Sequence, residues 1–337
     1  MPGRRPAPWH ALPRVALRDG ASPLVPLERF SAAIGAQVWA KRDDVGSITF
    51  AGNKVRKLEL LVADAVARDC DVLVAVGAAQ SNFARTAAAA AARLGLRAVL
   101  ILGGPPPDHL AGNLLLDRLV GAEIRFAGSD AWEVLQARLD DACDELRRAG
   151  RRPYALPMGG STPLGAVAFA AAYEELTDEL AARSLVPRVV VHASASGGTQ
   201  AGLELGRRML GGGPRIHAVD VAIPAEGLPA RVAALATGAA RLLDVDESWT
   251  PADVDVDGSQ VGAGYAVPTM AGLEAIALLA RTEGIVCDPV YTGKALAAVV
   301  AMARAGDAGP ILFWHTGGAP AIFDPHHGDP ILRSIGG

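Results

Sequence analysis

The sequence predicts an α/β fold built from two lobes, each an open twisted sheet covered by helices. Short apolar runs of strand length alternate with helical patterns through most of the 337 residues, which is typical of βαβ units around a buried parallel sheet. The alternation occurs in two blocks, one in the middle of the chain and one towards its end. Half of the residues are hydrophobic, which is enough for one large core or two moderate ones.

The middle block is predicted to form a sheet of its own. Its apolar runs read as strands, and the amphipathic stretches between them read as helices. Glycines are expected to end two of these helices, at Gly121 and Gly150. The expected strands are 71–76, 97–102, 122–126 and 153–156, and the expected helices are 81–94, 113–120 and 131–148.

The second block supplies the other lobe. A strongly apolar run at 188–192 leads into a turn of small residues at 194–199. The stretch 230–264 mixes alanine-rich helix with an acidic run, and its weak periodicity assigns no element. The proline-rich start of the chain is expected to be a flexible arm. Further strands are expected at 216–221 and 311–315, and helices at 166–182, 200–209 and 269–281.

Charge and composition exclude several classes of function. The formal net charge is −4 with both signs mixed along the chain, so no nucleic-acid surface is expected. No apolar run approaches the ~20 residues that cross a bilayer, so no membrane partner is expected. Cys70, Cys143 and Cys287 are far apart without a C-x-x-C spacing, which favours a reducing cytoplasm. His326 and His327 are expected to be solvated, and no metal site is predicted.

The first candidate for chemistry is a lysine at the start of a predicted helix. Lys54 follows Gly52 and Asn53 directly. The amino end of a helix disfavours a positive charge, so this position lowers the pKa of the amine. A lowered pKa suits a nucleophile, although a solvated lysine near Glu59 explains the pattern as well.

The second candidate is the turn at 194–199 between a strand and a helix. Its backbone N–H groups and the Thr199 hydroxyl can bind a phosphate at the start of the helix. A tight strand-to-helix connection is the plainer interpretation. The turn is not G-x-G-x-x-G and lacks the lysine of a P-loop, so neither a nicotinamide dehydrogenase nor a nucleoside triphosphatase is predicted.

The third candidate is a run of polar side chains, Gln80-Ser81-Asn82, directly after a predicted buried strand. Open α/β sheets bind ligands at the carboxyl ends of their strands. Ser81 or Asn82 can instead cap the following helix. The two roles are compatible, so both stay open.

Seven short motifs follow one another along nearly the whole chain. They are Lys41-Arg42-Asp43-Asp44, Gly52-Asn53-Lys54-x-Arg56-Lys57-Leu58-Glu59, Gln80-Ser81-Asn82, Gly159-Gly160-Ser161, Ser196-Gly197-Gly198-Thr199-x-Ala201-Gly202, Asp288-Pro289-Val290-Tyr291-x-Gly293-Lys294 and His315-Thr316-Gly317-Gly318. In this order they resemble the fold-type II pyridoxal phosphate enzymes, which have the tryptophan synthase β-subunit fold. Within that group the chain is most similar to the D-cysteine desulfhydrase and 1-aminocyclopropane-1-carboxylate deaminase family.

This resemblance implies pyridoxal 5′-phosphate as the cofactor and Lys54 as the Schiff-base lysine. It pairs Asn82 with the phenolic oxygen of the cofactor and assigns the phosphate to the loop at 196–199. It also implies that Ser81 and Tyr291 face the substrate, and Tyr265 resembles a second active-site tyrosine, with a buried core tyrosine as the alternative. The residues implied to bind the cofactor are Lys54, Asn82, Ser196, Gly197, Gly198, Thr199 and Thr316.

The two branches of the family differ near the ring nitrogen of the cofactor. Where the deaminases have the motif Tyr-Glu-Gly-Lys, this chain has Thr292 in place of the Glu. Its His-x-Gly-Gly motif contains Thr316, which resembles the pattern of the desulfhydrases. A hydroxyl leaves the pyridine ring largely neutral, which makes it a weaker electron sink than a carboxylate partner does. A weaker sink favours prompt loss of a β-substituent over opening of a cyclopropane ring.

The expected function is therefore that of a lyase that eliminates the β-substituent of a D-amino acid. D-cysteine would give pyruvate, ammonia and hydrogen sulfide. The alternatives are a 1-aminocyclopropane-1-carboxylate deaminase, a lyase for another β-substituted amino acid such as cysteate, and a cofactor-binding sensor or carrier without turnover. The family also differs from this chain at positions near the site, including Ala51, where glycine is frequent.

The resemblance further implies how the chain is divided and assembled. Residues 1–56 and 172–337 are expected to form a large domain that binds the cofactor, and residues 57–171 a small α/β domain. A homodimer that acts on a small amino acid is the expected assembly.

Overall fold

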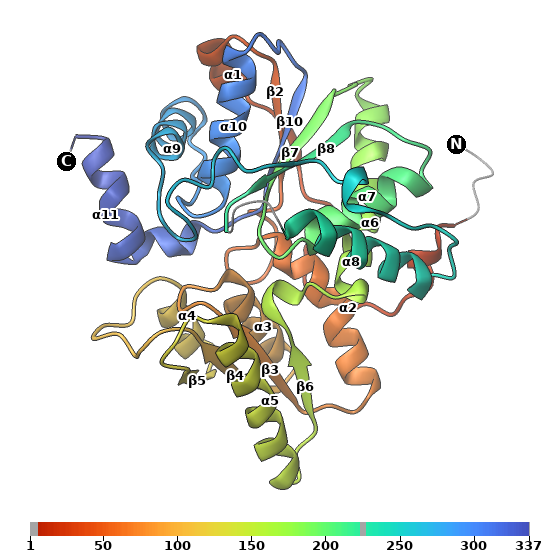
Figure 1. Ribbon diagram of the computed structural model, residues 1–337, viewed down its shortest axis with the longest axis vertical. Coiled ribbons are helices and arrows are strands. Elements are labelled where there is room, and N and C mark those ends of the chain that lie inside the picture. The colour runs from red at the N-terminus through yellow and green to blue at the C-terminus, as the bar shows by residue number, and fades with distance from the viewer. Residues whose placement is uncertain (1–5, 223–226, 337) are drawn as a thin grey trace.

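The computed structural model describes residues 6–222 and 227–336 and contains two sheets, one in each half of Figure 1. The larger sheet has the order β1-β2-β10-β7-β8-β9, and only β1 runs antiparallel to its neighbour. The smaller sheet, β5-β4-β3-β6, is parallel throughout. The predicted two-lobed α/β class is confirmed. The strands are β1 Leu24–Pro26, β2 Val38–Arg42, β3 Val72–Gly77, β4 Arg97–Leu102, β5 Glu123–Phe126, β6 Pro153–Leu156, β7 Val189–Ser194, β8 Arg215–Asp220, β9 Val256–Asp257 and β10 Ile311–His315.

Helices cover both sheets and connect most of the strands (Figure 1). Several begin where their sequence provides a cap. The side chains of Ser81, Thr162 and Thr269 each accept a backbone N–H at a helix start. The helices are α1 Glu28–Ile34, α2 Asn53–Ala67, α3 Asn82–Arg93, α4 Asn113–Leu119, α5 Trp132–Arg148, α6 Pro163–Ala182, α7 Gly198–Met209, α8 Leu228–Leu242, α9 Met270–Glu283, α10 Thr292–Arg304 and α11 Pro325–Ser334, with 3₁₀ turns η1 Pro8–Ala11, η2 Met158–Gly160, η3 Pro251–Asp253 and η4 Ala319–Phe323.

The central strand β3 shows why the smaller sheet forms. All six of its residues are buried, and they alternate between two cores. Leu73 and Ala75 pack with residues of α2 and α3, whereas Val72, Val74 and Val76 pack with residues of α5 on the other face. A strand buried on both faces needs a continuous apolar run, which explains why it was predictable. Its ladder with β4 carries the chain to the carboxyl edge of the sheet at Gly77.

The larger sheet follows the same rule around β7. Val189 and Val191 pack with α1, α9 and α10, and Val190 packs with α6 and α7 on the opposite face. The carboxyl ends of β7 and β10 therefore lie at the same edge of this sheet, since the two strands are parallel neighbours.

Most predicted elements lie within two residues of the observed ones, with α6 as an exception. This helix begins at Pro163 rather than at residue 166, because the Thr162 hydroxyl caps it and proline is favoured in a first helical turn. The stretch left unassigned at 230–264 contains most of α8 and the short strand β9. The strands β1 and β2 were not predicted either.

The prediction of a flexible N-terminal arm is wrong for the residues that the structure describes. The Trp9 side chain is fully buried, and its Nε1 donates a hydrogen bond to Glu174 Oε2 at 2.7 Å. Burial of an indole contributes a large apolar area, and the hydrogen bond satisfies its N–H. This segment is thereby held against α6.

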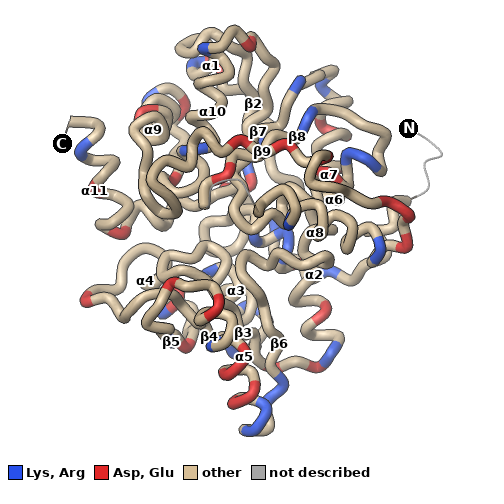
Figure 2. Tube along the Cα trace, viewed as in Figure 1, with Lys and Arg blue, Asp and Glu red and all other residues tan. Residues whose placement is uncertain are grey.

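The domain boundaries expected at 56/57 and 171/172 stay a prediction. The strands of the smaller sheet all lie within 57–171, and those of the larger sheet lie outside it. Both boundaries, however, fall inside helices, the first within α2 and the second within α6, and these two helices pack against each other. Segments with Lys or Arg and segments with Asp or Glu occur on both lobes in Figure 2.

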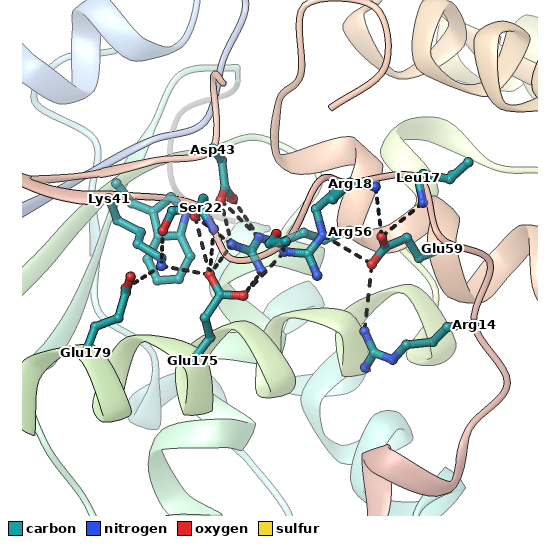
Figure 3. Close-up of polar contacts among 12 residues, drawn as sticks. Arg14, Leu17, Arg18, Ser22, Lys41, Asp43, Arg56, Glu59, Glu175 and Glu179 are labelled. Atoms are coloured by element: carbon teal, nitrogen blue, oxygen red, sulfur yellow. Dashed lines mark hydrogen bonds and ion pairs between the residues drawn. The ribbon is translucent and has the colours of Figure 1, made fainter. Parts of the chain in front are cut away.

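A buried ionic network joins β2, α2 and α6 (Figure 3). The Arg56 guanidinium donates to Asp43 Oδ1 at 2.8 Å and to Glu175 Oε1 at 2.8 Å. Lys41 Nζ lies 2.7 Å from the same Glu175 oxygen, and Trp314 Nε1 donates to Asp43 Oδ2 at 2.8 Å. Two of the recognised motifs, those beginning at Lys41 and at Gly52, thus contribute side chains to this network.

Candidate active site

A cavity of about 1070 Å³ lies where the carboxyl ends of strands from both sheets meet. Residues that follow β3, β7 and β10 line it, as expected for an open α/β sheet. Of the residues predicted to form the site, the cavity is lined by Lys54, Ser81, Asn82, Ser196, Gly197, Thr199, Tyr265, Tyr291 and Thr316. Gly198 does not line it but begins α7.

The loop before α2 delivers Lys54 into this cavity. Thr49, Phe50 and Ala51 all have left-handed backbone conformations, with φ of 39°, 59° and 51°. The Gly52 N–H donates to Asp43 O at 2.7 Å and the Asn53 N–H donates to Thr316 O at 3.0 Å. These bonds attach the loop to the ends of β2 and β10, so the second residue of the helix points its side chain into the cavity.

The Lys54 amine has no hydrogen-bond or ion-pair partner among the described residues, in contrast to most buried charges. Burial lowers its pKa to about 8, and the negative charge of Asp288 offsets part of this effect. A larger fraction of this amine than of an ordinary lysine is therefore neutral near neutral pH, and the neutral amine is the state that attacks an aldehyde.

The turn between β7 and α7 presents unused backbone donors. Gly197 caps α7 in a left-handed conformation, with φ of 83°, and no side chain of the described residues caps the first turn of the helix. These groups have no partner within the helix, and they suit an anion. A side chain at position 198 would not fit, since its Cβ would lie 2.6 Å from Ser161 Oγ and 2.8 Å from Lys57 Nζ. The turn therefore has both the donors and the shape for a phosphate.

Lys57 is a site residue that the sequence analysis did not single out. Its side chain is buried, and Nζ donates to Gly159 O at 3.1 Å and to Ser161 Oγ at 3.2 Å, beside the turn. Burial, together with the charge of Lys54, holds its pKa well below the ordinary value. The signal was available, because residues three apart in a helix share a face and Lys54 is already aimed at the cavity.

Ser81 and Asn82 both contribute to the cavity wall after β3. Ser81 Oγ accepts the Ala84 N–H at 3.1 Å, which is the predicted capping role. A capping hydroxyl still has its own hydrogen to donate. Asn82 Oδ1 accepts from Asn113 Nδ2 at 3.0 Å. The capping and ligand-facing interpretations therefore coexist in the geometry.

The hydroxyl groups of Tyr265 and Tyr291 contact each other at the cavity wall, and their rings meet edge to face with centroids 5.9 Å apart. Burial raises the pKa of Tyr291 well above its ordinary value, and the neighbouring Tyr265 adds to the effect. Both phenols are therefore protonated near neutral pH. Tyr265 is 39% exposed, so the alternative interpretation as a core tyrosine is wrong.

Thr316 and Thr292 have different surroundings. Thr316 lines the cavity, whereas Thr292 is fully buried and its Oγ1 donates to Asp288 Oδ2 at 2.6 Å. The same carboxylate accepts the backbone N–H groups of Val290, Tyr291 and Thr292. Thr292 stands at the position where the deaminases have Glu, and its hydroxyl is hydrogen-bonded to Asp288.

The prediction that His326 and His327 are solvated is correct for His326, which is exposed, and wrong for His327. Both border the cavity, and His327 is only 6% exposed, with Nδ1 3.4 Å from Asp324 Oδ1. α11 returns to the site after β10, which the sequence pattern did not indicate. Among the residues that the structure describes, no group of three or more His, Cys, Asp or Glu side chains is arranged to bind a metal ion. No described helix is both long and apolar enough to cross a bilayer.

Comparisons with known proteins agree with this geometry. Residues 15–317 match the family described as pyridoxal-phosphate dependent enzyme. The chain is 37% identical over 324 residues to a 1-aminocyclopropane-1-carboxylate deaminase of Burkholderia vietnamiensis, which covers 92% of this chain and 95% of the relative. It is 40% identical over 333 residues to a D-cysteine desulfhydrase of Salmonella choleraesuis, covering 95% and 99%.

Solved structures extend the comparison. The crystal structure of an ACC deaminase homologue superposes with a TM-score of 0.88 at 36% identity, covering 98% of this chain and 100% of that one. A threonine deaminase from Solanum lycopersicum shares the fold, with a TM-score of 0.69 at 16% identity over 98% of this chain and 86% of the other. The chain therefore belongs to the pyridoxal-phosphate-dependent enzymes, in the group that contains 1-aminocyclopropane-1-carboxylate deaminases and D-cysteine desulfhydrases, and its cofactor is pyridoxal 5′-phosphate.

Proposed function

We propose that the enzyme eliminates the β-substituent of a D-amino acid and that D-cysteine is its substrate, giving pyruvate, ammonia and hydrogen sulfide. The observation that carries the proposal is that Thr316, a hydroxyl residue, lines the cavity. Thr292, at the position where the deaminases have Glu, is buried away from the cavity and bonded to Asp288, so position 292 supplies no carboxylate there. A hydroxyl partner leaves the ring of the cofactor a weaker electron sink than a carboxylate partner does. This favours rapid loss of a leaving group after the Cα proton is removed.

The residues implied to bind the cofactor fit it. Lys54 supplies a neutral amine, Asn82 a donor for the ring oxygen, and the turn from Ser196 to Thr199 the donors for the phosphate. We include Lys57 beside that turn as a donor to the same phosphate, whose negative charge would favour the protonated form of this amine. When bound, pyridoxal phosphate supplies the electron sink that acidifies the Cα–H bond of an amino acid.

The Lys54 amine is assigned as the base that takes the Cα proton. Its pKa of about 8 allows it to accept a proton near neutral pH without being saturated. Ser81 uses its oxygen as a cap for α3, so its hydrogen is available to the substrate carboxylate.

Tyr291 and Tyr265 are assigned to the leaving group. Because their hydroxyl groups contact each other, one donates to the other and the second keeps a hydrogen for the departing thiolate. The raised pKa of Tyr291 keeps that proton on the phenol, so the pair stabilises the departing sulfur by a hydrogen bond. The sulfur thus leaves as hydrosulfide and takes its second proton from solvent to give hydrogen sulfide, while the Cα proton stays on Lys54.

A panel of D- and L-amino acids, assayed for pyruvate, 2-oxobutyrate, ammonia and sulfide, tests the proposal. We expect D-cysteine to give pyruvate and sulfide in equal amounts. Cysteate as the better substrate, with sulfite as product, would change the leaving group but keep the chemistry. Absence of turnover on every amino acid, with the cofactor bound, would favour the sensor or carrier instead.

A second candidate is ring opening of 1-aminocyclopropane-1-carboxylate. It is favoured by the relative that bears this name at 37% identity, close to the 40% of the desulfhydrase. Formation of 2-oxobutyrate from this substrate, faster than pyruvate from D-cysteine, would replace our proposal.

The tyrosine assignment has a matched control within the chain. Tyr291→Phe should lower kcat/KM for D-cysteine by about 100-fold. Tyr154→Phe should leave it unchanged, because Tyr154 lies on β6 and donates to Asp64 outside the cavity. Equal activity of the two variants would remove Tyr291 from the reaction. The homodimer and the cytoplasmic location remain proposals from the family, and sedimentation of the holoenzyme measures the first.

A further inference from the structure

We propose that Asn113 is a positioning residue that fixes the direction of the Asn82 carboxamide, so that this amide presents its N–H groups to the cavity. The inference rests on the proposed function, in which Asn82 is the donor for the ring oxygen of the cofactor. Asn113 belongs to α4 and does not line the cavity. It would therefore act only through Asn82.

The argument begins at Gln80, whose amide has one possible orientation. Its Nε2 lies 3.0 Å from the backbone oxygen of Ala111, and its Oε1 lies 2.8 Å from the backbone nitrogen of Asn113. A backbone oxygen only accepts and a backbone N–H only donates, so the two ends of the amide cannot be exchanged. The second Nε2 hydrogen reaches Asp324 Oδ2 at 3.0 Å.

The next amide, that of Asn113, is fixed in the same way. Its Nδ2 lies 2.8 Å from the backbone oxygen of Gln80, which requires a donor at this place. The remaining hydrogen of Nδ2 points to Asn82, at 3.0 Å from Oδ1. The atom of Asn82 that meets a donor must be an acceptor, so Oδ1 faces Asn113. Asn82 Nδ2 is then on the other side, and no described residue accepts its hydrogens.

Asn113 cannot turn over to release this constraint. Its side chain is fully buried, and a reversed amide would set Oδ1 against the Gln80 oxygen. Oδ1 has no partner in its present place among the described residues, so the protein tolerates one unsatisfied oxygen to keep Nδ2 where it is. Gly112 permits the approach, with φ of 56°, since a Cβ there would lie 2.6 Å from Gln80 Oε1.

The direction of the Asn82 amide matters because donors and acceptors act oppositely on an anionic oxygen. Hydrogen bonds from an N–H to a charged oxygen are among the stronger ones in proteins. An amide oxygen in the same place would repel the charge. The backbone oxygen of Gln80, acting through the Asn113 amide, thus sets which end of Asn82 the cofactor would meet.

The dissociation constant of pyridoxal 5′-phosphate and the visible absorption maximum of the holoenzyme test the inference. Asn82→Ala should weaken cofactor binding by about tenfold and shift the maximum. Asn113→Leu should do the same, and the double variant should be no weaker than Asn82→Ala alone. Leu115→Ala, on the exposed face of α4, is the control and should change neither quantity.

Asn113→Asp provides a second route if Asn113→Leu does not fold. Its carboxylate has the same shape but accepts only, so it should attract Asn82 Nδ2, turn Oδ1 to the cavity, and weaken binding more than tenfold. Effects of Asn82→Ala and Asn113→Leu that multiply in the double variant would overturn the inference, as would a normal spectrum for Asn113→Asp. If Asn82→Ala itself changes neither quantity, the role of Asn82 in the proposed function fails instead.

Discussion

Lys54 and Arg56 are cations on the same turn of α2, and their surroundings differ completely. Arg56 is buried, whereas Lys54 is only partly buried, in the wall of the cavity. Arg56 donates to Asp43, Glu175 and Ser22. Burial alone would lower its pKa, but the two carboxylates outweigh burial and raise it. Lys54 has no such partner among the described residues, and burial dominates its pKa.

The comparison teaches that one helix supports both structure and chemistry by controlling which charge is paired. A fully paired buried cation stays charged and inert, and removing it leaves its partners unpaired. An unpaired buried amine loses its charge readily, which costs stability but keeps it nucleophilic. The following substitutions separate the contribution of the paired cation to stability from the contribution of the unpaired amine to reactivity.

The largest expected effect is on turnover. Lys54→Ala should lower the rate of pyruvate formation from D-cysteine by about 10³-fold or more, because it removes the proposed base. Circular dichroism and thermal unfolding should show an intact fold. Pyruvate formation at the parental rate would contradict the assignment of Lys54.

The next effect is on stability. Arg56→Met should lower the free energy of unfolding by about 3 to 5 kcal/mol, since the buried Asp43 would remain without its cation and Glu175 would keep only Lys41 and Arg18. Arg56 also lowers the pKa of Glu175 below its ordinary value of 4.5, against the opposing effect of burial. The stability from this pair is therefore present above about pH 4.5 and is lost as the pH falls. Urea unfolding from pH 3 to 7 should show a smaller acid loss in Arg56→Met than in the parent.

In the apoprotein, replacing Lys54 should raise the free energy of unfolding, by less than replacing Arg56 lowers it. Its pKa is about 8 when folded and 10.5 ordinarily, so between these values the unfolded chain binds more protons and stability rises with pH. Lys54→Met should be more stable than the parent by about 2 to 3 kcal/mol below pH 8. The gain should fall towards zero near pH 10.5. A gain that does not depend on pH would show that the amine is solvated.

The smallest change in the free energy of unfolding is expected for a substitution at the carboxyl end of α2. Arg68 forms an exposed pair with Asp64, at 3.0 Å. Arg68→Ala should change the free energy of unfolding by less than about 0.5 kcal/mol, because solvent and salt weaken such pairs. A loss comparable to that of Arg56→Met would mean that burial does not explain the difference between the pairs.

Strands and helices with an apolar or periodic sequence pattern of their own were predictable from the sequence. The run from β3 to β6 follows from apolar strands and periodic helices, and its boundaries lie within two residues of the prediction. β2 was missed because Lys41 and Arg42 break its apolar pattern. The carboxylates that allow Lys41 to be buried come from α6, far away in sequence.

In the candidate site, too, residues in local motifs were predictable, and residues placed by contacts distant in sequence were not. Residues in contiguous motifs, such as Gln80-Ser81-Asn82 and the turn at 196–199, were identified and meet at one cavity. Asn113 and His327 were not, because their places depend on how α4 and α11 fold back on the site. No local pattern marks such a residue. Lys57 lies between these cases, since helical spacing from Lys54 predicts its face but not its partners.

The left-handed run at Thr49, Phe50 and Ala51 has a consequence for how the molecule tolerates change. A side chain in this conformation costs about 1 to 2 kcal/mol per residue, and Arg85 Nη2 helps to hold the run by donating to Ala51 O at 3.2 Å. Glycine usually loosens a folded chain, but it carries no Cβ to be strained here. Position 51, where the family often has glycine, is therefore a place where the smaller residue relaxes the backbone, and this chain keeps the strained one directly ahead of its reactive amine.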